Sequence, residues 1–366
     1  MDTRIINIGQ IVTPLATRST PNASVSIREG ADMLLRGGRI VDVAPNPSGP
    51  VGVEIDAGGG VVMPGLIDPH THCPDPCDSS EAPPGLKAVA RRLRRALRSG
   101  VTTVEVKCSS LEQLADLAAL VHEDAEPLPD VVATLFGAAP PDGTPHAERM
   151  AALIGDAIPT VRRSRLASFC DVACGDGAYP PDEARTILRA ARAAGLHLKL
   201  HASAGCAQAT GELAVDLGAS AVGHVAGLEP REASGWKRVG VLPVFLPGDA
   251  LLGESRPLDA AGLLAANVSV GIGTNAGGGP AAVGSMWLVL ALAIASLGLT
   301  LDQALTAATA YNAQVLESAD EIGALDVGKR ADLIILDVAD YRDLLGGLGE
   351  EPIRAVIRGG RVVHQR

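Results

Sequence analysis

The stretch VVMPGLIDPHTHCPDP, residues 61–76, joins an apolar run to two histidines, His70 and His72, that stand one residue apart. A short apolar run closed by Pro-Gly and Asp-Pro is typical of a buried strand that ends in a loop. Side chains of an extended segment alternate between its two faces, so both imidazoles would point the same way. Such a pair at a strand end indicates a metal site, whereas the same pair in an exposed turn has no chemical role. The rest of the chain has to decide between these two interpretations.

Apolar runs of this kind recur along the chain, with helix-like segments between them. Eight strands are predicted, at Val61–Pro64 and at 101–107, 131–136, 165–172, 196–201, 221–224, 241–246 and 268–274. Strands that alternate with helices form a parallel sheet with the helices outside. Eight such units, in a span close to the ~250 residues typical of the fold, predict a closed (β/α)8 TIM barrel.

The two ends of the chain have a different pattern. Residues 1–60 and 320–366 contain short alternating strands separated by glycine turns, as in RIINIGQIVTP and IRAVIRGGRVV. Each end is too small to enclose a core of its own. We therefore expect 1–60 and 320–366 to pair into one composite β-sandwich beside a barrel formed by 61–319.

The composition of the chain indicates which binding partners and which cellular compartment to expect. The 366 residues carry a formal net charge of −11, and the only basic block is one arginine-rich helix, so nucleic acids and anionic membranes are not expected partners. A small-molecule substrate is expected instead. No signal peptide is visible, and the most apolar stretch, 284–300, is shorter than the ~20 residues of a membrane span. The six cysteines are scattered without a CxxC pair, which predicts reduced thiols in the cytoplasm.

Other predicted strands also end in polar side chains. Reactive groups of a TIM barrel lie at the carboxyl ends of its strands. The fifth, sixth and eighth predicted strands bring His201, His224 and Asn275 to that end. Three imidazoles that meet at one point bind Zn²⁺ or a similar ion and leave one position open. Because histidines and an asparagine recur at the ends of several predicted strands, the sequence favours a metal site over a chance pair of histidines.

The motifs MPGLIDPHTH, VTTVEVK, LKLHA and GTN, with the closing IGALDVGKRADLIILD, resemble the amidohydrolase superfamily and within it the imidazolonepropionase branch. The resemblance covers nearly the whole chain. It implies a single divalent metal ion, expected to be zinc with iron or manganese as alternatives, held by His70, His72 and His201. It also implies that His224 orients or polarises the substrate, and it raises a homodimer as an option because dimers are common in the superfamily.

The chain departs from that branch at the positions that define the reaction. Asn275 stands where an aspartate normally binds the metal and takes a proton, and a neutral amide cannot act as a base. A glutamate and a histidine of the branch are replaced by Ala204 and Ala139, and the branch's KSGYG reads KCSSL at 107–111, without its tyrosine. The segment that supplies an arginine for the substrate carboxylate is short and reads CPDPCDSSEAPPG. Imidazolonepropionate is therefore not the expected substrate.

Several functions remain open at this point. The first is hydrolysis of another small cyclic amide or heterocyclic metabolite, with His224 or Asp171 moving the proton. The second is ring closure, elimination or isomerisation in the same pocket, and the third is a non-catalytic protein that binds a ligand. Asn275 is either natural or an introduced inactivating substitution.

Further residues near the expected barrel mouth have two interpretations. Cys73 and Cys206 lie in loops at that mouth, together with Cys77 and Cys174, and are either pocket thiols or small packing residues. Lys107 is a further pocket candidate. It shares one face of its strand with Glu105, and we expect these two residues to form a mutual ion pair inside the barrel.

Overall fold

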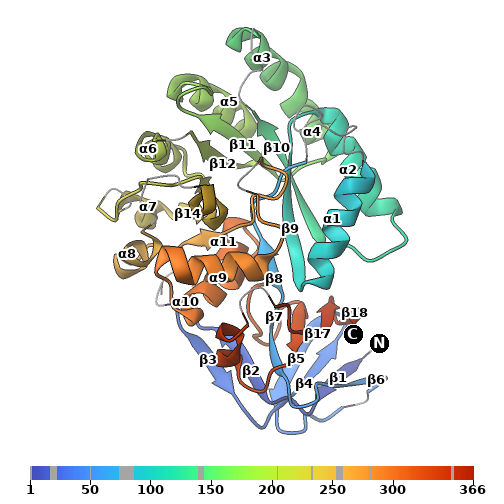
Figure 1. The fold of residues 1–366 in the computed structure, drawn as a ribbon. Helices are drawn as coiled ribbons and strands as arrows, with labels where there is room; N and C mark the ends of the chain where they lie inside the picture. Colours follow the sequence, from blue (N-terminus) through green and yellow to red (C-terminus); the bar gives the residue numbers. More distant parts are fainter. Residues whose placement is uncertain are drawn as a thin grey trace.

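The computed structural model describes residues 2–16, 23–49, 51–73, 86–138, 144–203, 205–231, 234–252, 259–279, 282–347 and 350–366. Its centre is an eight-stranded parallel sheet in which each strand pairs with its neighbours in chain order (Figure 1). The strands are β8 (Leu66–Asp68), β9 (Val101–Cys108), β10 (Asp130–Gly137), β11 (Phe169–Cys174), β12 (His197–Ala202), β13 (Ala221–Gly223), β14 (Leu242–Phe245) and β15 (Gly271–Ile272). The sheet curls into a nearly closed barrel, which confirms the predicted TIM fold.

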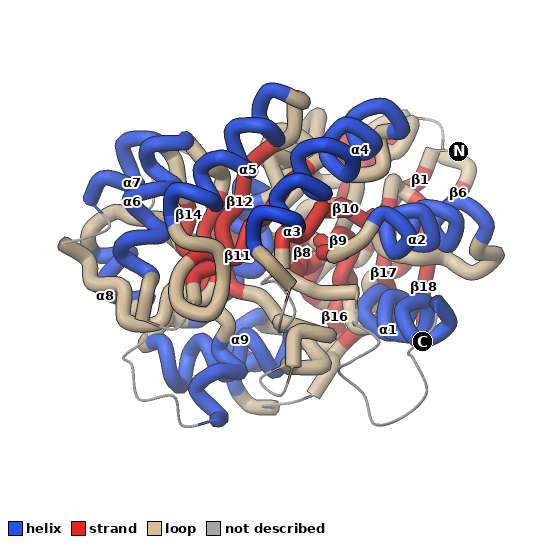
Figure 2. Tube along the Cα trace, turned by 90° about the horizontal axis from the view of Figure 1, so that it is seen from above, coloured by secondary structure: helices blue, strands red, loops and turns tan. Residues whose placement is uncertain are grey.

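Helices surround the strands, as the view down the barrel shows (Figure 2). They are α1 (Leu86–Arg98), α2 (Leu111–Glu123), α3 (His146–Ala152), α4 (Ile158–Ser164), α5 (Pro181–Ala193), α6 (Ala207–Leu217), α7 (Ser234–Val239), α8 (Ala260–Ala265), α9 (Met286–Leu297), α10 (Leu301–Thr306) and α11 (Asn312–Val315). Shorter π- or 3-10 turns are η1 (Leu153–Ala157), η2 (Pro247–Leu252), η3 (Ala307–Tyr311) and η4 (Tyr341–Leu345). The core between strands and helices is aliphatic, as the low aromatic content predicts.

The first barrel strand differs from the prediction. The run Val61–Pro64 forms β7, which belongs to the small domain, and the barrel begins at β8. All four residues of β7 are buried, so its sequence has the unbroken apolar pattern of a barrel strand. Gly65 separates the two strands, and an added Cβ there would lie only 2.2 Å from Thr102 Oγ1. This close approach lets the chain pass directly from one sheet into the other.

The two ends of the chain form the expected composite sandwich. One sheet has the order β5 (Arg39–Ala44), β4 (Asp32–Arg36), β1 (Thr3–Ile6), β6 (Val53–Asp56). The other has the order β18 (Arg361–Gln365), β17 (Ile353–Arg358), β16 (Leu333–Leu336), β7, β2 (Gln10–Pro14), β3 (Val25–Arg28). A separate cluster of buried apolar side chains from both ends of the chain forms its core. The division at residues 60 and 320 remains a prediction, although β7 now pairs with the sandwich strands β2 and β16.

At the seam of the barrel, the strands β8 and β15 have no ladder of backbone hydrogen bonds between them, and the side chain of Asn312 bridges the two strands. Asn312 of α11 donates from Nδ2 to the carbonyl oxygens of Ile67 (2.7 Å) and Ile272 (2.8 Å). Its Oδ1 accepts from the Ile272 amide (3.1 Å). Beyond the seam, the Asn275 amide donates to the His70 carbonyl oxygen (3.0 Å). The first and last barrel strands, β8 and β15, therefore place His70 and Asn275 side by side.

Among the described helices, α9 is strongly apolar but only 12 residues long. No described helix has both the length and the apolar character needed to cross a membrane.

Candidate metal centre

Four imidazoles meet at the carboxyl ends of the barrel strands. His70 and His72 follow β8, His201 lies near the end of β12, and His224 follows β13. The ring centroids of His70 lie 5.2 Å from His72, 5.4 Å from His201 and 5.2 Å from His224. The His201 and His224 centroids are 4.0 Å apart. The structure thus brings together all four histidines that the sequence places at strand ends.

The donor atoms of this cluster fit a divalent metal ion. His70 Nε2 and His72 Nε2 are 3.3 Å apart. Two tetrahedral ligands, each about 2.0–2.1 Å from one zinc ion, would be separated by about 3.3–3.4 Å. One ring nitrogen from each of His70, His201 and His224 lies within 4.8 Å of the others. The cluster can therefore hold a metal ion, as expected for this superfamily.

Two further atoms of the site lack protein partners. Asn275 Oδ1 and His201 Nδ1 are buried, and neither has a hydrogen-bond partner within the described part of the chain. A buried polar atom without a partner is costly, and a metal ion is one way to satisfy it. Asn275 Oδ1 is therefore a neutral oxygen donor that faces the cluster without a partner among the described residues.

The environment keeps these rings uncharged. Burial, followed by the nearby positive charge of Lys107, lowers the pKa of His70 and His72 well below the usual 6.5. Burial, followed by His224 and Lys107, has the same effect on the pKa of His201. Neutral imidazole is the form that binds metals, so the site is preorganised for ligation at neutral pH.

The backbone at the sixth and eighth strand ends is strained. His224 and Asn275 adopt left-handed φ angles of 58° and 54°, which few non-glycine residues adopt. Such conformations concentrate at functional sites, where the surrounding structure holds them in place. Gly278 follows Asn275 closely, and an added Cβ there would lie 2.1 Å from Asn275 Oδ1. The glycines of GTNAGG thus make room for the Asn275 side chain.

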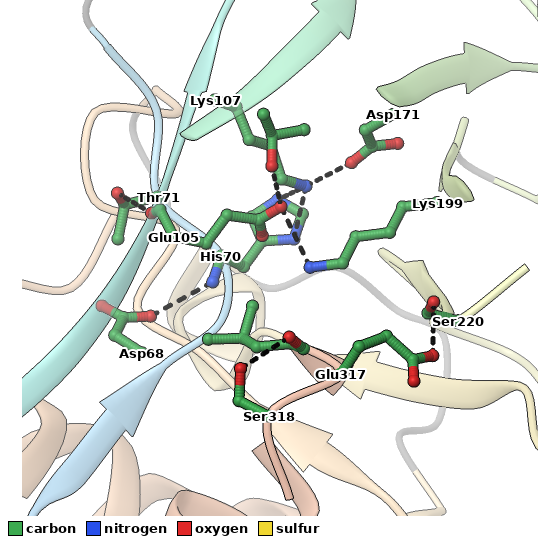
Figure 3. Close-up of polar contacts among 12 residues, drawn as sticks. Asp68, His70, Thr71, Glu105, Lys107, Asp171, Lys199, Ser220, Glu317 and Ser318 are labelled. Carbon is green, nitrogen blue, oxygen red and sulfur yellow. Dashed lines mark hydrogen bonds and ion pairs between the residues drawn. The ribbon is translucent and has the colours of Figure 1, made fainter. Parts of the chain in front are cut away.

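Two ion pairs fill the barrel beneath the histidines (Figure 3). Lys107 Nζ lies 2.5 Å from Asp171 Oδ2 and 3.0 Å and 3.2 Å from the two ring nitrogens of His70. Lys199 Nζ lies 3.0 Å from Glu105 Oε1, which also accepts from the Thr134 hydroxyl. The expected pair between Glu105 and Lys107 is therefore wrong. Residues two apart on a strand are about 6.6 Å apart, so each side chain pairs across the barrel at its own level.

Asp171 was predicted as one of two candidates for moving a proton. It is fully buried, with one carboxylate oxygen held by Lys107. It is not one of the described residues that line the pocket above the histidines. Its direct connection to the site is through Lys107, which contacts both Asp171 and His70.

The pocket above the cluster has about 600 Å³ of free space, including its open mouth. Its described wall consists of His72, Cys73, Lys107, Ser109, Phe136, Ala138, His201, His224, Gly277 and Gly278. Cys73 and Lys107 thus lie where the sequence predicted pocket residues. Cys206 lies instead at the start of α6 against Gly175, and is not part of that wall. The predictions for Cys77, Ala139 and Ala204 fall outside the described residues.

Several residues that shape the site were not predicted from the sequence. The Phe136 ring packs 5.3 Å from both His72 and His201, and its position at a predicted strand end could have indicated this. Arg92 of α1 donates to the His72 carbonyl oxygen and so fixes the backbone of the segment 70–72. Nothing distinguishes Arg92 from its arginine neighbours in RRLRRALR, so the sequence carries no signal for it.

Asp68 fixes the exit of β8. Its carboxylate accepts from the Thr274 hydroxyl (2.5 Å), the Thr274 amide (3.2 Å) and the His70 amide (3.4 Å). Burial raises its pKa to about 6, against the opposing effect of these hydrogen bonds. Asp68 therefore joins the first and eighth strand ends just below the histidine cluster.

The fold and the site define a class, namely TIM-barrel proteins with a histidine cluster able to hold a divalent metal ion. The sequence pattern of the Amidohydrolase family matches residues 61–363, and the chain belongs to this family. It is related to imidazolonepropionases. The protein of that name from Geobacillus kaustophilus (strain HTA426) is 34% identical over 350 residues, which cover 84% of this chain and 82% of the relative. The one from Solibacter usitatus (strain Ellin6076) is 31% identical over 416 residues and covers 100% and 99%.

Solved structures share the fold at lower identity. An adenosine deaminase from Xanthomonas campestris with bound zinc aligns with a TM-score of 0.78 and 19% identity, over 99% of this chain and 92% of that one. An amidohydrolase from a Sargasso Sea environmental sample aligns with a TM-score of 0.79 and 18% identity, over 100% and 93%. These similarities support the barrel and sandwich architecture.

Proposed function

We propose that this chain hydrolyses a C–N bond of a small cyclic amide or heterocyclic metabolite other than imidazolonepropionate. The metal ligands would be His70, His72 and His201, with Asn275 Oδ1 as a neutral oxygen donor. The observation that supports this best is the 3.3 Å separation of the two Nε2 atoms, next to a buried Asn275 oxygen without a partner among the described residues. Zinc is the expected ion, with iron or manganese as alternatives, because imidazole nitrogens suit all of them.

A divalent ion bound at these residues would supply Lewis acidity and lower the pKa of a water molecule at the site. The protein's own groups would supply the proton transfer and the positioning. Asn275 cannot take a proton, since an amide has no basic site at neutral pH. His224, whose ring lies 4.0 Å from that of His201 on the pocket wall, is the group we assign to proton transfer. Phe136 would shield the histidines from bulk water on one side.

The different substrate is supported by the residues that replace the branch's recognition groups. The segment 107–111, KCSSL, lacks the tyrosine of the branch, and Ser110 at that place caps α2 with its hydroxyl, which accepts from the Gln113 amide (3.1 Å). Ala204 and Ala139, in place of the glutamate and histidine, carry no polar side chain. A pocket built to hydrogen-bond one substrate discriminates strongly against it once those groups are lost.

One observation favours a second candidate function. No carboxylate lines the described wall of the pocket. A site that lacks a carboxylate base is poorly suited to activate water, but it could stabilise an anion formed in ring closure, elimination or isomerisation. A protein that only binds a ligand is the remaining alternative.

The test is metal analysis followed by a ring-opening assay on the purified, metal-supplemented protein. We expect one metal ion per chain and ring opening with at least one substrate from a panel of hydantoins, dihydropyrimidines and lactams. His224→Ala should abolish turnover while the metal content stays the same, and His122→Ala on the exposed face of α2 serves as the matched control. Metal retention without any ring opening would move the assignment to the second candidate, and absence of metal would overturn both.

We also propose that the protein acts on its small-molecule substrate in the cytoplasm, without nucleic-acid or membrane partners. None of the five described cysteines forms a disulfide, which suits a reducing compartment. The homodimer suggested by the resemblance stays a prediction.

A further inference from the structure

Two cysteines lie side by side next to the histidine cluster. Cys73 directly follows His72 and belongs to the described pocket wall, whereas Cys108 ends β9 and is wholly buried. The two thiols are in hydrogen-bonding contact. One sulfur is therefore accessible from the pocket, and the other is buried against it.

The backbone fixes this contact. His72 and Lys107 form a parallel β-bridge. The Lys107 amide donates to the Thr71 carbonyl oxygen (2.9 Å), and the Cys73 amide donates to the Lys107 carbonyl oxygen (2.7 Å). Cys73 and Cys108 are the next residues along these two paired segments, and paired strands lie about 4.8 Å apart. This spacing is within the Cα separation of about 4.4–6.8 Å that a disulfide requires.

The thiol pair is connected to the histidine cluster through Arg92 and through the chain itself. The Arg92 guanidinium interacts electrostatically with both thiols and donates to the His72 carbonyl oxygen. Cys73 follows His72 without an intervening residue. A movement of the Cys73 backbone therefore displaces His72, whose Nε2 lies 3.3 Å from His70 Nε2, the separation that suits a shared metal ion.

We propose that Cys73 and Cys108 form a reversible disulfide when the protein meets a hydroperoxide, and that this modification weakens metal binding by the histidine cluster. Cys73 reacts first because it lines the pocket. Contact with Cys73, followed by burial, raises the pKa of Cys108, so Cys108 stays a thiol until Cys73 has been oxidised. The disulfide itself does not depend on the proposed hydrolysis, and only its effect on metal binding depends on the histidine cluster.

The reaction is a two-electron oxidation in two steps. Cys73 Sγ attacks the O–O bond of the hydroperoxide, which breaks, and the Cys73 proton passes to the departing oxygen to give water or an alcohol. Cys73 is then a sulfenic acid. Cys108 Sγ forms the S–S bond with Cys73 Sγ, the S–O bond breaks, and the oxygen leaves as water with the Cys108 proton. A dithiol reductant returns two electrons and two protons and restores both thiols.

Bond formation has a structural consequence. It replaces a contact between two thiols by a covalent bond, so the two sulfurs must approach each other and Cys73 is drawn toward β9. Cys108 is held in the barrel core, whereas Cys73 lies outside a strand and only packs against that core. We therefore expect Cys73 to move, and with it the backbone of His72.

The test treats the reduced, metal-free protein with hydrogen peroxide and follows it by peptide mapping and by zinc titration against a competing chelator. We expect one cross-link, between Cys73 and Cys108, which dithiothreitol removes. Zinc affinity should fall by at least about tenfold on oxidation and return on reduction, since disturbing the support of a metal ligand costs about 10–100-fold in affinity. Neither measurement requires turnover.

Variants assign the effect to the disulfide. In Cys108→Ala no cross-link should form, and peroxide should leave Cys73 as a sulfenic acid that dimedone traps. Reduced Cys73→Ala and reduced Cys108→Ala should bind zinc as tightly as the unsubstituted protein, which separates the disulfide from loss of a thiol ligand. Cys206→Ser, which changes a thiol at the start of α6 outside the described pocket wall, is the matched control and should keep both the cross-link and the fall in affinity.

The outcomes separate this inference from the proposed function. Absence of a cross-link, or a cross-link between other cysteines, would overturn the disulfide, and zinc binding with ring opening would still retain the proposed function. A cross-link that leaves zinc affinity unchanged, or weaker zinc binding by the reduced cysteine variants, would overturn the effect of the disulfide on the cluster. Reduced protein that binds no zinc would overturn the proposed function and this effect, yet leave the disulfide itself standing.

Discussion

His70 Nε2 and His72 Nε2 face each other across 3.3 Å at the exit of β8. Burial lowers the pKa of both rings, so both imidazoles are neutral. A neutral imidazole has one N–H and one bare nitrogen, so one Nε2–H can donate to the other Nε2 in the metal-free protein. The same separation is the one that two ligands of a tetrahedral metal ion have, so the pair is placed for a chelate once both Nε2 atoms are bare.

The first prediction is that His70→Ala abolishes metal retention. Its ring lies in the middle of the cluster, within 5.4 Å of the other three ring centroids, so no other single histidine can replace it. Elemental analysis after dialysis should fall from about one ion per chain to near zero. Added zinc should stabilise the unsubstituted protein by about 3 kcal/mol at one hundred times the dissociation constant, and should not stabilise the variant. His122→Ala should behave as the unsubstituted protein.

The second prediction concerns the pH dependence of the metal-free protein. His70, His72 and His201 have lowered pKa values in the fold, so below about pH 6.5 the unfolded chain takes up three protons that the folded chain does not. Asp68 acts oppositely, because its folded pKa of about 6 exceeds the usual 3.8 and the folded chain gains a proton first. Three protons against one leave a net loss of stability near pH 5, with a slope of about 3 kcal/mol per pH unit.

Urea unfolding after treatment with a chelator measures this effect at pH 7 and pH 5. Stability should be lower at pH 5, and zinc should raise stability at both pH values without reducing the difference, because the folded histidines are unprotonated with or without the metal. Equal or greater stability at pH 5 would show that the three histidines are not buried as neutral rings.

The sequence predicted the histidine cluster at the barrel mouth because its signal is local. His70 and His72 share a face through the two-residue period of a strand, and His201 and His224 lie at strand ends that a parallel barrel must bring together. The partners of Lys107 could not be predicted in the same way. They depend on which residues of β9, β11 and β12 lie at the same level inside the barrel, and that level is set by strand stagger.

Two other features could not be predicted from the sequence, for different reasons. The run Val61–Pro64 is buried on both faces in the sandwich, so its pattern is the same as that of a barrel strand. Arg92 acts through one position of α1, and the pattern of a basic helix does not reveal which arginine reaches the site.

The third prediction is that Lys107→Met destabilises the protein strongly. The variant leaves Asp171 buried without its cation, and breaking a buried pair from one side costs about 3–5 kcal/mol. Adding Asp171→Asn should recover a large part of the loss, because it removes the unpaired charge. Chemical unfolding of both variants measures the difference. Arg342→Met, which breaks the exposed pair with Asp340, is the control and should change stability little. A mild effect of Lys107→Met would contradict the buried ion pair.

The fourth prediction is that Asn312→Ala opens the barrel seam. It leaves two carbonyl groups and one amide of β8 and β15 without partners, each costing about 1–3 kcal/mol. We expect a loss of at least about 3 kcal/mol in unfolding free energy, together with faster hydrogen exchange at Ile67 and Ile272 and weaker metal binding. Gln208→Ala on the exposed face of α6 is the matched control. Unchanged exchange at the seam would show that the strands hold together without Asn312.

The fifth prediction is that Asn275→Asp strengthens metal binding by at least about tenfold, since a charged oxygen ligand replaces a neutral one. The substitution preserves side-chain shape, and aspartate tolerates the left-handed φ of 54° almost as well as asparagine does. Titration with a chelator as competitor measures the change, and the ring-opening panel is repeated on the same samples. A gain in turnover would identify the missing base as the limit on hydrolysis, whereas tighter metal binding with lower turnover would favour the non-hydrolytic reaction. Unchanged metal affinity would mean that Asn275 Oδ1 is not a ligand, and the metal would then have to be held by the histidines alone.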